Sequence, residues 1–109
     1  MGKLSLESSQ EIPLNATCAV FAESEVVSLI HQKTPKGDIA KAVHDGISTR
    51  ITSMARRVGL EKDVALVGGV ALNPGFVASL KRDLETDILI PEDSEYVGAY
   101  GAALAAASV

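Results

Sequence analysis

The sequence predicts an α/β fold in which helices flank a short parallel sheet. Two short aliphatic segments, 64–67 and 88–90, have the composition of buried parallel strands. A helical pattern lies between them, and the order strand, helix, strand implies a right-handed crossover. The chain has no Trp, two Tyr and two Phe, so its core must come from aliphatic side chains. We therefore expect one small domain over residues 1–109.

Two helices and an extended lead-in are predicted before the first strand. Residues 4–15 are mixed and polar, include Pro13, and indicate an extended segment or edge strand. Residues 16–32 look helical from about Phe21, and segment 34–37 is a break. Asp38 is expected to cap a long helix that ends at Gly59. Its apolar residues recur at spacings of three or four and form one stripe: Ile39, Val43, Ile47, Ile51, Met54 and Val58.

A glycine turn and two more helices follow the first strand. Gly68 and Gly69 close that strand, Asn73 suits the cap of the next helix, and Pro74 suits its first turn. The inner face of this helix is predicted to be Val77, Leu80 and Leu84. A final helix is expected over about 94–106. Its many Gly and Ala residues would let its backbone approach a neighbour closely.

Charge and hydropathy exclude several classes of protein. The net charge is −4 and the basic residues are scattered, so nucleic acid is not an expected partner. No apolar run approaches the roughly 20 residues of a membrane-spanning helix, and no membrane partner is expected. The first fifteen residues lack the features of a signal peptide, which favours a cytoplasmic location. Cys18 is the single cysteine, which excludes an intrachain disulfide.

The glycine turn is the segment whose residues are best suited to binding a ligand. Glycines after a buried strand let backbone N–H groups approach a ligand with no Cβ in the way. Ligands of open parallel sheets bind at the carboxyl ends of the strands, where Gly68 and Gly69 are expected. No Lys-Ser/Thr pair follows, so the turn is not a Walker loop. Taken alone, the pattern favours a plain structural connection.

Two segments resemble the actin-like ATPase superfamily, which includes sugar kinases. Residues 66–73 (LVGGVALN) resemble its adenosine motif, and residues 91–103 (PEDSEYVGAYGAA) resemble its closing helix. The resemblance implies a partial actin-like, ribonuclease H-like half-domain that contributes part of an ATP or ADP site with Mg. The residues that it implies for nucleotide binding are Gly68, Gly69, Val70, Ala71 and Asn73.

Cys18 lies just ahead of a predicted helix, whose N-terminus would stabilise a thiolate, the species that binds metal. A free cysteine is more often a small buried hydrophobe, and one thiolate cannot form a four-thiolate site. Segment 17–26 (TCAVFAESEV), taken with the long helix and the glycine turn, nevertheless resembles a narrower family. That family comprises the activators of 2-hydroxyacyl-CoA dehydratases and the ATPase subunits of benzoyl-CoA reductase.

This narrower resemblance implies an ATP-driven electron donor. In the family, a homodimer holds one [4Fe–4S] cluster with two cysteines from each subunit and serves an acyl-CoA dehydratase or aryl-CoA reductase. Cys18 matches the second of these cysteines. The segment that carries the first cysteine and the two phosphate loops have no counterpart here. We therefore expect a C-terminal half-domain of a longer protein that does not hydrolyse ATP alone. It would be an engineered truncation, a proteolytic remnant or the product of a short reading frame.

No catalytic residue is assigned from the sequence. Asp45 lies opposite the apolar stripe and, like Glu23 and Glu25, is interpreted as a solvated charge. His31 and His44 have no metal-ligand spacing. Two alternatives remain open: a non-catalytic dimerisation or interaction module of the same fold, and the nucleotide half of another actin-like ATPase such as a sugar kinase. An unpaired sheet edge would favour self-association.

Overall fold

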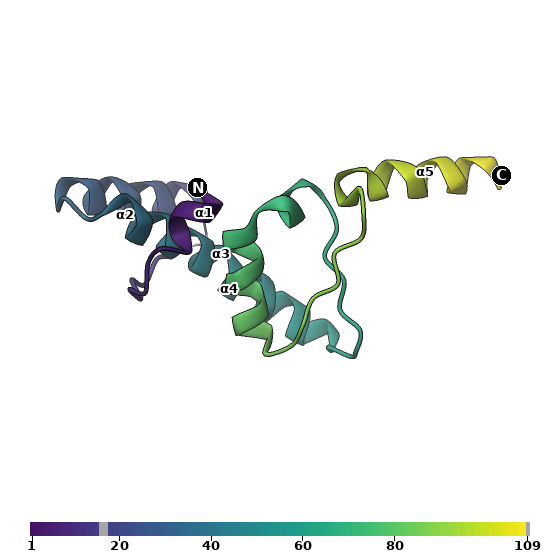
Figure 1. Cartoon of the computed structure of the whole chain (residues 1–109), viewed down its shortest axis with the longest axis horizontal. Coiled ribbons are helices and arrows are strands. Elements are labelled where there is room, and N and C mark those ends of the chain that lie inside the picture. Colours follow the sequence, from purple (N-terminus) through teal and green to yellow (C-terminus); the bar gives the residue numbers. More distant parts are fainter. Residues whose placement is uncertain (16–17, 109) are drawn as a thin grey trace.

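The computed structural model describes residues 1–15 and 18–108, which form a helical body with a helix extending from it on either side (Figure 1). The molecule is elongated and measures 55 × 24 × 24 Å. The described helices are α1 (Gly2–Ser5), α2 (Ala19–His31), α3 (Lys36–Val58), the 3₁₀ helix η1 (Gly69–Leu72), α4 (Pro74–Leu84), the 3₁₀ helix η2 (Ser94–Tyr96) and α5 (Val97–Ala107).

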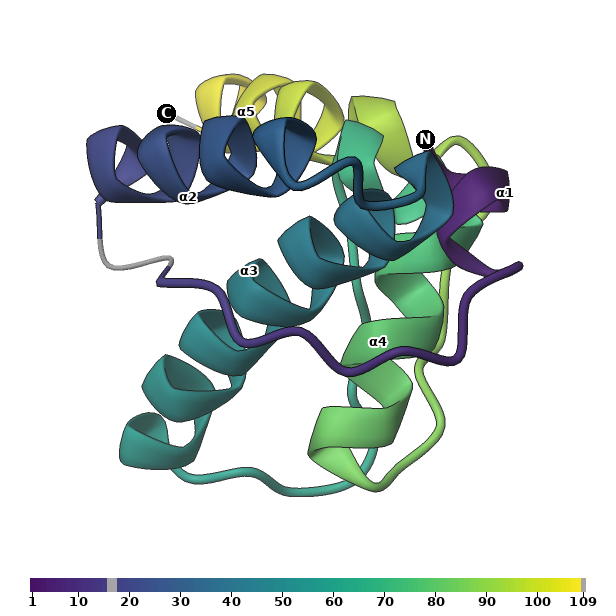
Figure 2. The ribbon, with the colours of Figure 1, turned by 90° about the vertical axis from the view of Figure 1, so that its left-hand side faces the viewer.

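The body is built on the packing of α4 against α3. Its buried apolar cluster comprises Phe76, Leu80, Leu84 and Ile88, with Ile51, Val64 and Leu66 packed against it. The prediction of an inner face on α4 is confirmed, because Val77, Leu80 and Leu84 are all buried. Figure 2 shows segment 6–15 running across α3 and α4.

The predicted parallel sheet appears among the described residues as a single bridge. Ala65 and Leu89 pair in parallel, with Leu66 N donating to Leu89 O and Leu89 N donating to Val64 O, both at 2.9 Å. The parallel direction is therefore as predicted, but two full strands are not confirmed. Parallel strands are usually covered on both faces. Here Ala65, Val67 and Leu89 are exposed, so the pairing lacks the cover that would extend it.

The first helix corrects the expectation of an extended segment from residue 4. α1 forms over Gly2–Ser5, and residues 6–15 are irregular. α1 lies against α3 and α4 so closely that a Cβ on Gly75 would collide with the carbonyl oxygen of Gly2 and the hydroxyl of Ser5. This helix therefore depends on tertiary contact, which a local sequence pattern does not reveal.

The sequence predicted the end of α3 correctly but not its start. It starts at Lys36 after Pro35, so the prediction of Asp38 as its cap is wrong, and Asp38 lies in the first turn instead. Asp38 accepts a hydrogen bond from the hydroxyl of Ser8 at 2.6 Å. The end at Gly59, with a φ of 97°, is confirmed.

The most deeply buried residues of α3 lie outside its apolar stripe. The buried residues are Ala40, Ala42, His44, Ser48 and Thr52. In the stripe, Ile47, Met54 and Val58 are 41, 47 and 89 % exposed. Small and polar side chains thus line the contact of α3 with α1 and α4.

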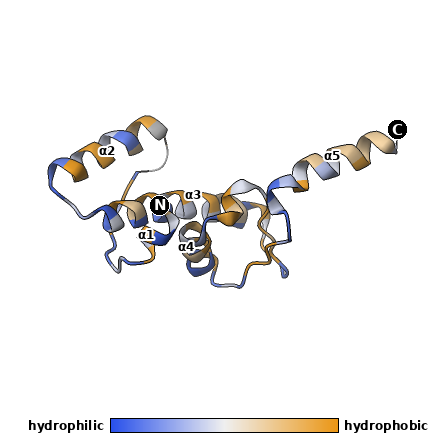
Figure 3. Cartoon of the chain, turned by 45° about the horizontal axis from the view of Figure 1, so that its top comes forward, coloured by the Kyte–Doolittle hydropathy of each residue, from blue (hydrophilic) through white to orange (hydrophobic). Residues whose placement is uncertain are grey.

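Two helices stand apart from the body. α2 confirms the predicted helix after Cys18, although Ala16 and Thr17 lie outside the described residues, and α2 packs against α3 alone among the described elements. α5 confirms the final helix, but among the described helices it contacts only η2, and it buries no residue. Figure 3 shows α5 mostly in pale and orange shades, from the middle to the hydrophobic end of the hydropathy scale. Among the described residues, no helix is both long and apolar enough to cross a membrane.

Candidate functional site

The glycine turn is anchored on one side and open on the other. Gly68 has a φ of 103°, which L side chains rarely adopt. Its N–H donates to the carbonyl oxygen of Ser94 at 2.8 Å, and the buried Ser94 hydroxyl donates back to the Gly68 carbonyl at 3.4 Å. A Cβ at Gly68 or Gly69 would meet no described atom within 4 Å. A ligand could therefore approach the backbone here.

Val70 and Ala71 lie in η1 directly after the turn. Ala71 is buried, whereas Val70 is 59 % exposed. The Ala71 N–H donates to the Gly68 carbonyl at 3.2 Å. A cavity of about 350 Å³ lies beside η1 and α4, lined by Ala71, Leu72, Pro74, Val77, Ala78, Lys81 and Ile90. Its walls are apolar apart from one cation.

Asn73 caps α4, as predicted. Its Oδ1 accepts hydrogen bonds from the backbone N–H groups of Gly75 at 3.0 Å and Phe76 at 3.2 Å. Its Nδ2 lies 3.0 Å from Nε2 of His44 on α3. Both ends of the Asn73 amide are thus engaged within the fold, and a direct contribution of this side chain to a ligand stays a prediction.

His44 is the residue near the turn that sequence reasoning missed. Its side chain is 4 % exposed, and Nδ1 has no hydrogen-bond partner among the described residues. Burial, with the nearby N-terminal ammonium, holds the pKa of His44 below its ordinary value, although Asp45 opposes this. No local spacing could have found His44, because 29 residues separate it from Asn73.

Asp45 is not the solvated charge that was predicted. Its side chain is 17 % exposed and accepts hydrogen bonds from Lys41 at 2.6 Å, Ser79 at 2.7 Å and Arg82 at 3.0 Å. Burial alone would raise the pKa of Asp45, but these three donors hold it below its ordinary value. Through Ser79 and Arg82, the carboxylate joins α3 to α4.

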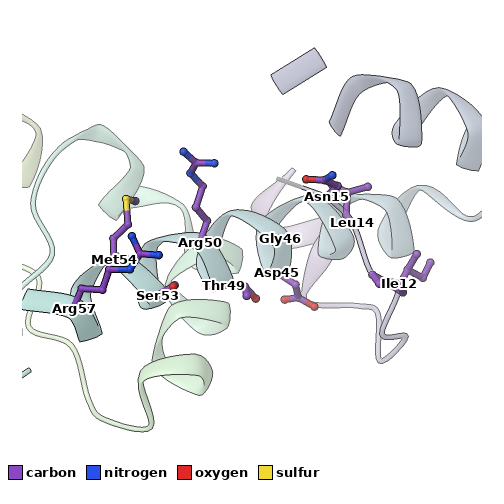
Figure 4. A pocket seen from close by; sticks show the side chains of 11 residues that line it. Ile12, Leu14, Asn15, Asp45, Gly46, Thr49, Arg50, Ser53, Met54 and Arg57 are labelled. Atoms are coloured by element: carbon purple, nitrogen blue, oxygen red, sulfur yellow. The ribbon is translucent and has the colours of Figure 1, made fainter. Parts of the chain in front are cut away.

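A larger cavity lies away from the glycine turn. It has a volume of about 650 Å³ and lies between α3 and segment 12–15 (Figure 4). Its lining residues are Ile12, Pro13, Leu14, Asn15, Asp45, Gly46, Thr49, Arg50, Ser53, Met54 and Arg57. None of the residues that the sequence suggested for nucleotide or metal binding is among them.

Cys18 lies at the N-cap position of α2 and is exposed. Its side chain makes no cap hydrogen bond, and its carbonyl accepts from the Ala22 N–H at 3.1 Å. Because α2 packs only against α3 among the described elements, the structure does not bring Cys18 to the glycine turn. Within residues 1–15 and 18–108, no three His, Cys, Asp or Glu side chains gather as metal ligands would.

Comparison with known proteins points to one family. The model of the BadF/BadG/BcrA/BcrD ATPase family matches residues 1–106. The 2-hydroxyisocaproyl-CoA dehydratase activator of Clostridioides difficile is 39 % identical over 95 % of this chain and 39 % of its own length. The (R)-2-hydroxyglutaryl-CoA dehydratase activating ATPase of Acidaminococcus fermentans is 40 % identical over 95 % of this chain and 40 % of its own length. A benzoyl-CoA reductase subunit from Thauera aromatica is 29 % identical over 95 % of this chain and 39 % of its own length.

Solved structures give the same result. The 2-hydroxyisocaproyl-CoA dehydratase activator from Clostridium difficile, with bound ADPNP, aligns over 96 % of this chain and 39 % of its own, with a TM-score of 0.88 and 39 % identity. Component A of the Acidaminococcus fermentans (R)-2-hydroxyglutaryl-CoA dehydratase aligns over 94 % of this chain and 40 % of its own, with a TM-score of 0.87 and 40 % identity. The chain spans about two fifths of the length of these relatives.

Proposed function

This chain belongs to the BadF/BadG/BcrA/BcrD ATPase family, and we propose that it supplies the adenosine side of the nucleotide site in an ATP-driven activator of a CoA-ester dehydratase or reductase. The observation that carries the proposal is the open glycine turn, which leads into η1, where Ala71 and Leu72 line an apolar cavity. Because the chain spans about two fifths of its relatives, ATP hydrolysis and electron transfer would belong to a longer protein. This chain would be its C-terminal, actin-like half-domain, located in the cytoplasm.

The geometry fits the adenosine part of a nucleotide better than its phosphates. Gly68 and Gly69 leave space at the turn, and Gly69 and Val70 open η1, where backbone N–H groups have no partner within the helix. The neighbouring cavity offers apolar walls of the kind that hold a flat base. Phosphoryl transfer needs positioned metal and charge stabilisation, and we assign neither Mg ligands nor a catalytic residue to this chain.

We extend the proposal to Cys18 as one ligand of a [4Fe–4S] cluster shared across a homodimer. Cys18 is exposed at the start of α2, so an external cluster could reach its thiol. A cluster of this type takes four thiolates, and one chain supplies one. The residues present do not form a complete ligand set, and thiols from outside the chain would have to complete it.

A non-catalytic interaction module is the second candidate, favoured by the apolar surface of the last two helices. Tyr96, Tyr100 and Leu104 are more than half exposed, and α5 buries no residue. On this interpretation the same fold docks to a second copy or to the dehydratase or reductase component, and the glycines are structural. The nucleotide half of a sugar kinase is less well supported, because the named relatives are activators and part of a reductase.

Nucleotide-dependent stabilisation separates the two candidates. A chain that binds ADP gains about 2.7 kcal/mol of stability at a hundredfold excess over its dissociation constant. Gly69→Val would fill the open space at the turn without a positive φ to strain it, and we expect it to abolish the ADP-dependent rise in Tm. Ala106→Val is the control, since it adds similar bulk at an exposed position of α5. An unchanged Tm of the wild-type chain in millimolar ADP would favour the interaction module.

A further inference from the structure

His44 and Asn73 form a contact that connects the interior of the fold to the glycine turn. Resting on the nucleotide site proposed above, we infer that neutral His44 is a positioning residue, which accepts a hydrogen bond from Asn73 and so holds the turn in its binding form. The two side chains are 3.0 Å apart, between Nε2 of His44 and Nδ2 of Asn73.

The hydrogen-bond inventory of Asn73 fixes the direction of this contact. Its Oδ1 already accepts from two backbone N–H groups, those of Gly75 and Phe76, so the atom facing His44 is the amide nitrogen. An amide nitrogen only donates. Nε2 of His44 must therefore accept, and the neutral ring carries its proton on Nδ1. That Nδ1 is buried with no partner among the described residues.

Protonation of His44 would remove the contact. The imidazolium donates from both nitrogens, so Nε2–H would face the amide hydrogens of Asn73. The charged groups that act on the ring are the N-terminal ammonium of Met1, which disfavours its cation, and Asp45, which favours it. Asp45 already accepts hydrogen bonds from donors on α3 and α4, and its charge is paired with Lys41 and Arg82. α1 adds Lys3, while η1 and residues 74–80 of α4 carry no titratable group. Among the charged groups that act on His44 in the described residues, the one carboxylate, Asp45, is therefore already paired.

The backbone transmits the position of Asn73 to the turn. The Asn73 N–H donates to the Val70 carbonyl at 2.9 Å, and the Ala71 N–H donates to the Gly68 carbonyl at 3.2 Å. On the other side, α1 restricts Asn73, because a Cβ on Gly2 would collide with its Oδ1. Asn73 therefore has little room to move while α1 is docked. Loss of the His44 contact would change the position of η1.

The wild-type chain tests the tautomer directly. Long-range ¹H–¹⁵N NMR of the His44 ring should show the Nδ1–H tautomer at pH 8, and it should persist below pH 6.5, the ordinary midpoint for histidine. The side-chain amide signals of Asn73 should shift together with the protonation of His44. An Nε2–H tautomer, or Asn73 signals that ignore His44 protonation, would overturn the inference. This measurement needs no nucleotide and no variant.

Matched variants test the effect on binding. His44→Gln offers a carbonyl that can accept from Asn73 without titrating, whereas His44→Phe fills the space but cannot accept. We expect His44→Phe to weaken ADP binding by roughly three- to tenfold at pH 8 and His44→Gln to restore it. The wild type should also lose affinity in acid, and His44→Gln should abolish that loss. His31→Gln, on the exposed end of α2, should behave as wild type.

The binding experiment can refute the role of His44 and the nucleotide site separately. Equal weakening by His44→Gln and His44→Phe would overturn the positioning role. No binding of ADP by the wild type at any pH would instead refute the proposed nucleotide site, and the tautomer and the Asn73 signals would then decide the role of His44 alone.

Discussion

The carboxylate of Asp45 on α3 accepts a hydrogen bond from the hydroxyl of Ser79 on α4 at 2.7 Å. Lys41 and Arg82 donate to the same carboxylate from either side. Ser48 on α3 likewise donates to Asp83 on α4 at 2.7 Å. The two central helices are therefore joined by a row of polar contacts beside their small apolar cluster.

Asp45→Asn should lower the free energy of unfolding by about 1–3 kcal/mol at pH 7. The amide cannot accept from Lys41, Ser79 and Arg82 with the strength of a carboxylate, and two cations lose their partner. Urea unfolding followed by circular dichroism measures the change. Asp87→Asn serves as the control, because Asp87 is 83 % exposed in its side chain and its loss should leave the midpoint unchanged. Equal midpoints for both variants would contradict the structural role of Asp45.

The same carboxylate should make stability depend on acid. Burial alone would raise the pKa of Asp45, but its three donors bring the pKa below the ordinary value, which is about 3.9. A folded-state pKa below the unfolded one gives stability that is fully present above the unfolded pKa and lost as pH falls through the folded one. We expect urea midpoints of the wild type to fall steeply below about pH 4, and those of Asp45→Asn to fall less. Parallel profiles would refute the assignment.

Local sequence patterns were sufficient to predict several helix ends and the direction of strand pairing. Asn73 with Pro74 marked the start of α4, and Gly59 marked the end of α3, because caps and positive-φ glycines act within one turn. The apolar runs around Ala65 and Leu89 gave the right parallel direction. The extent of the sheet was not predictable, because it depends on what covers its faces.

The buried polar residues of α3 could not be predicted from the periodicity of its apolar residues. A position opposite the apolar stripe of α3 normally faces water, and this reasoning placed Asp45 in solvent. The structure buries His44, Ser48 and Thr52 instead, because α1 and α4 approach that face. The contact between His44 and Asn73 spans 29 residues and leaves no trace in either local pattern. The roles of the glycine turn and Cys18 in ligand binding stay predictions.

Gly75→Ala should destabilise the fold by about 1–3 kcal/mol. Its Cβ would meet the backbone carbonyl of Gly2 and the hydroxyl of Ser5, and a backbone atom cannot swing aside as a flexible side chain can. α1 would have to leave the surface of α4. Gly101→Ala is the matched control, since its Cβ meets no described atom within 4 Å and α5 buries no residue. In urea denaturation, the midpoint of Gly75→Ala should fall below that of the wild type, and the midpoint of Gly101→Ala should stay the same. An unchanged midpoint for Gly75→Ala would contradict the docking of α1.

Cys18→Ser should abolish iron uptake. After anaerobic reconstitution with iron, sulfide and an added thiol, the wild type should bind about four irons per dimer. The variant should bind none and keep the same circular dichroism spectrum, because Cys18 is exposed and its side chain caps no N–H of α2. Iron analysis and the visible spectrum give the readout. Equal iron in both proteins would refute the assignment of Cys18, and none in either would show that this chain alone does not assemble the cluster.

The amides of α5 should exchange with solvent far faster than those of α3 and α4. α5 has 11 residues, buries none of them and, among the described helices, contacts only η2. Isolated helices of fewer than about 12–15 residues are marginal in water, so α5 should open without unfolding the body. Hydrogen exchange followed by NMR makes the comparison, with Phe76 and Leu80 as protected references in the same sample. Protection of α5 that rises with protein concentration would show that a second copy covers Tyr100 and Leu104, whereas protection at every concentration would contradict its extended position.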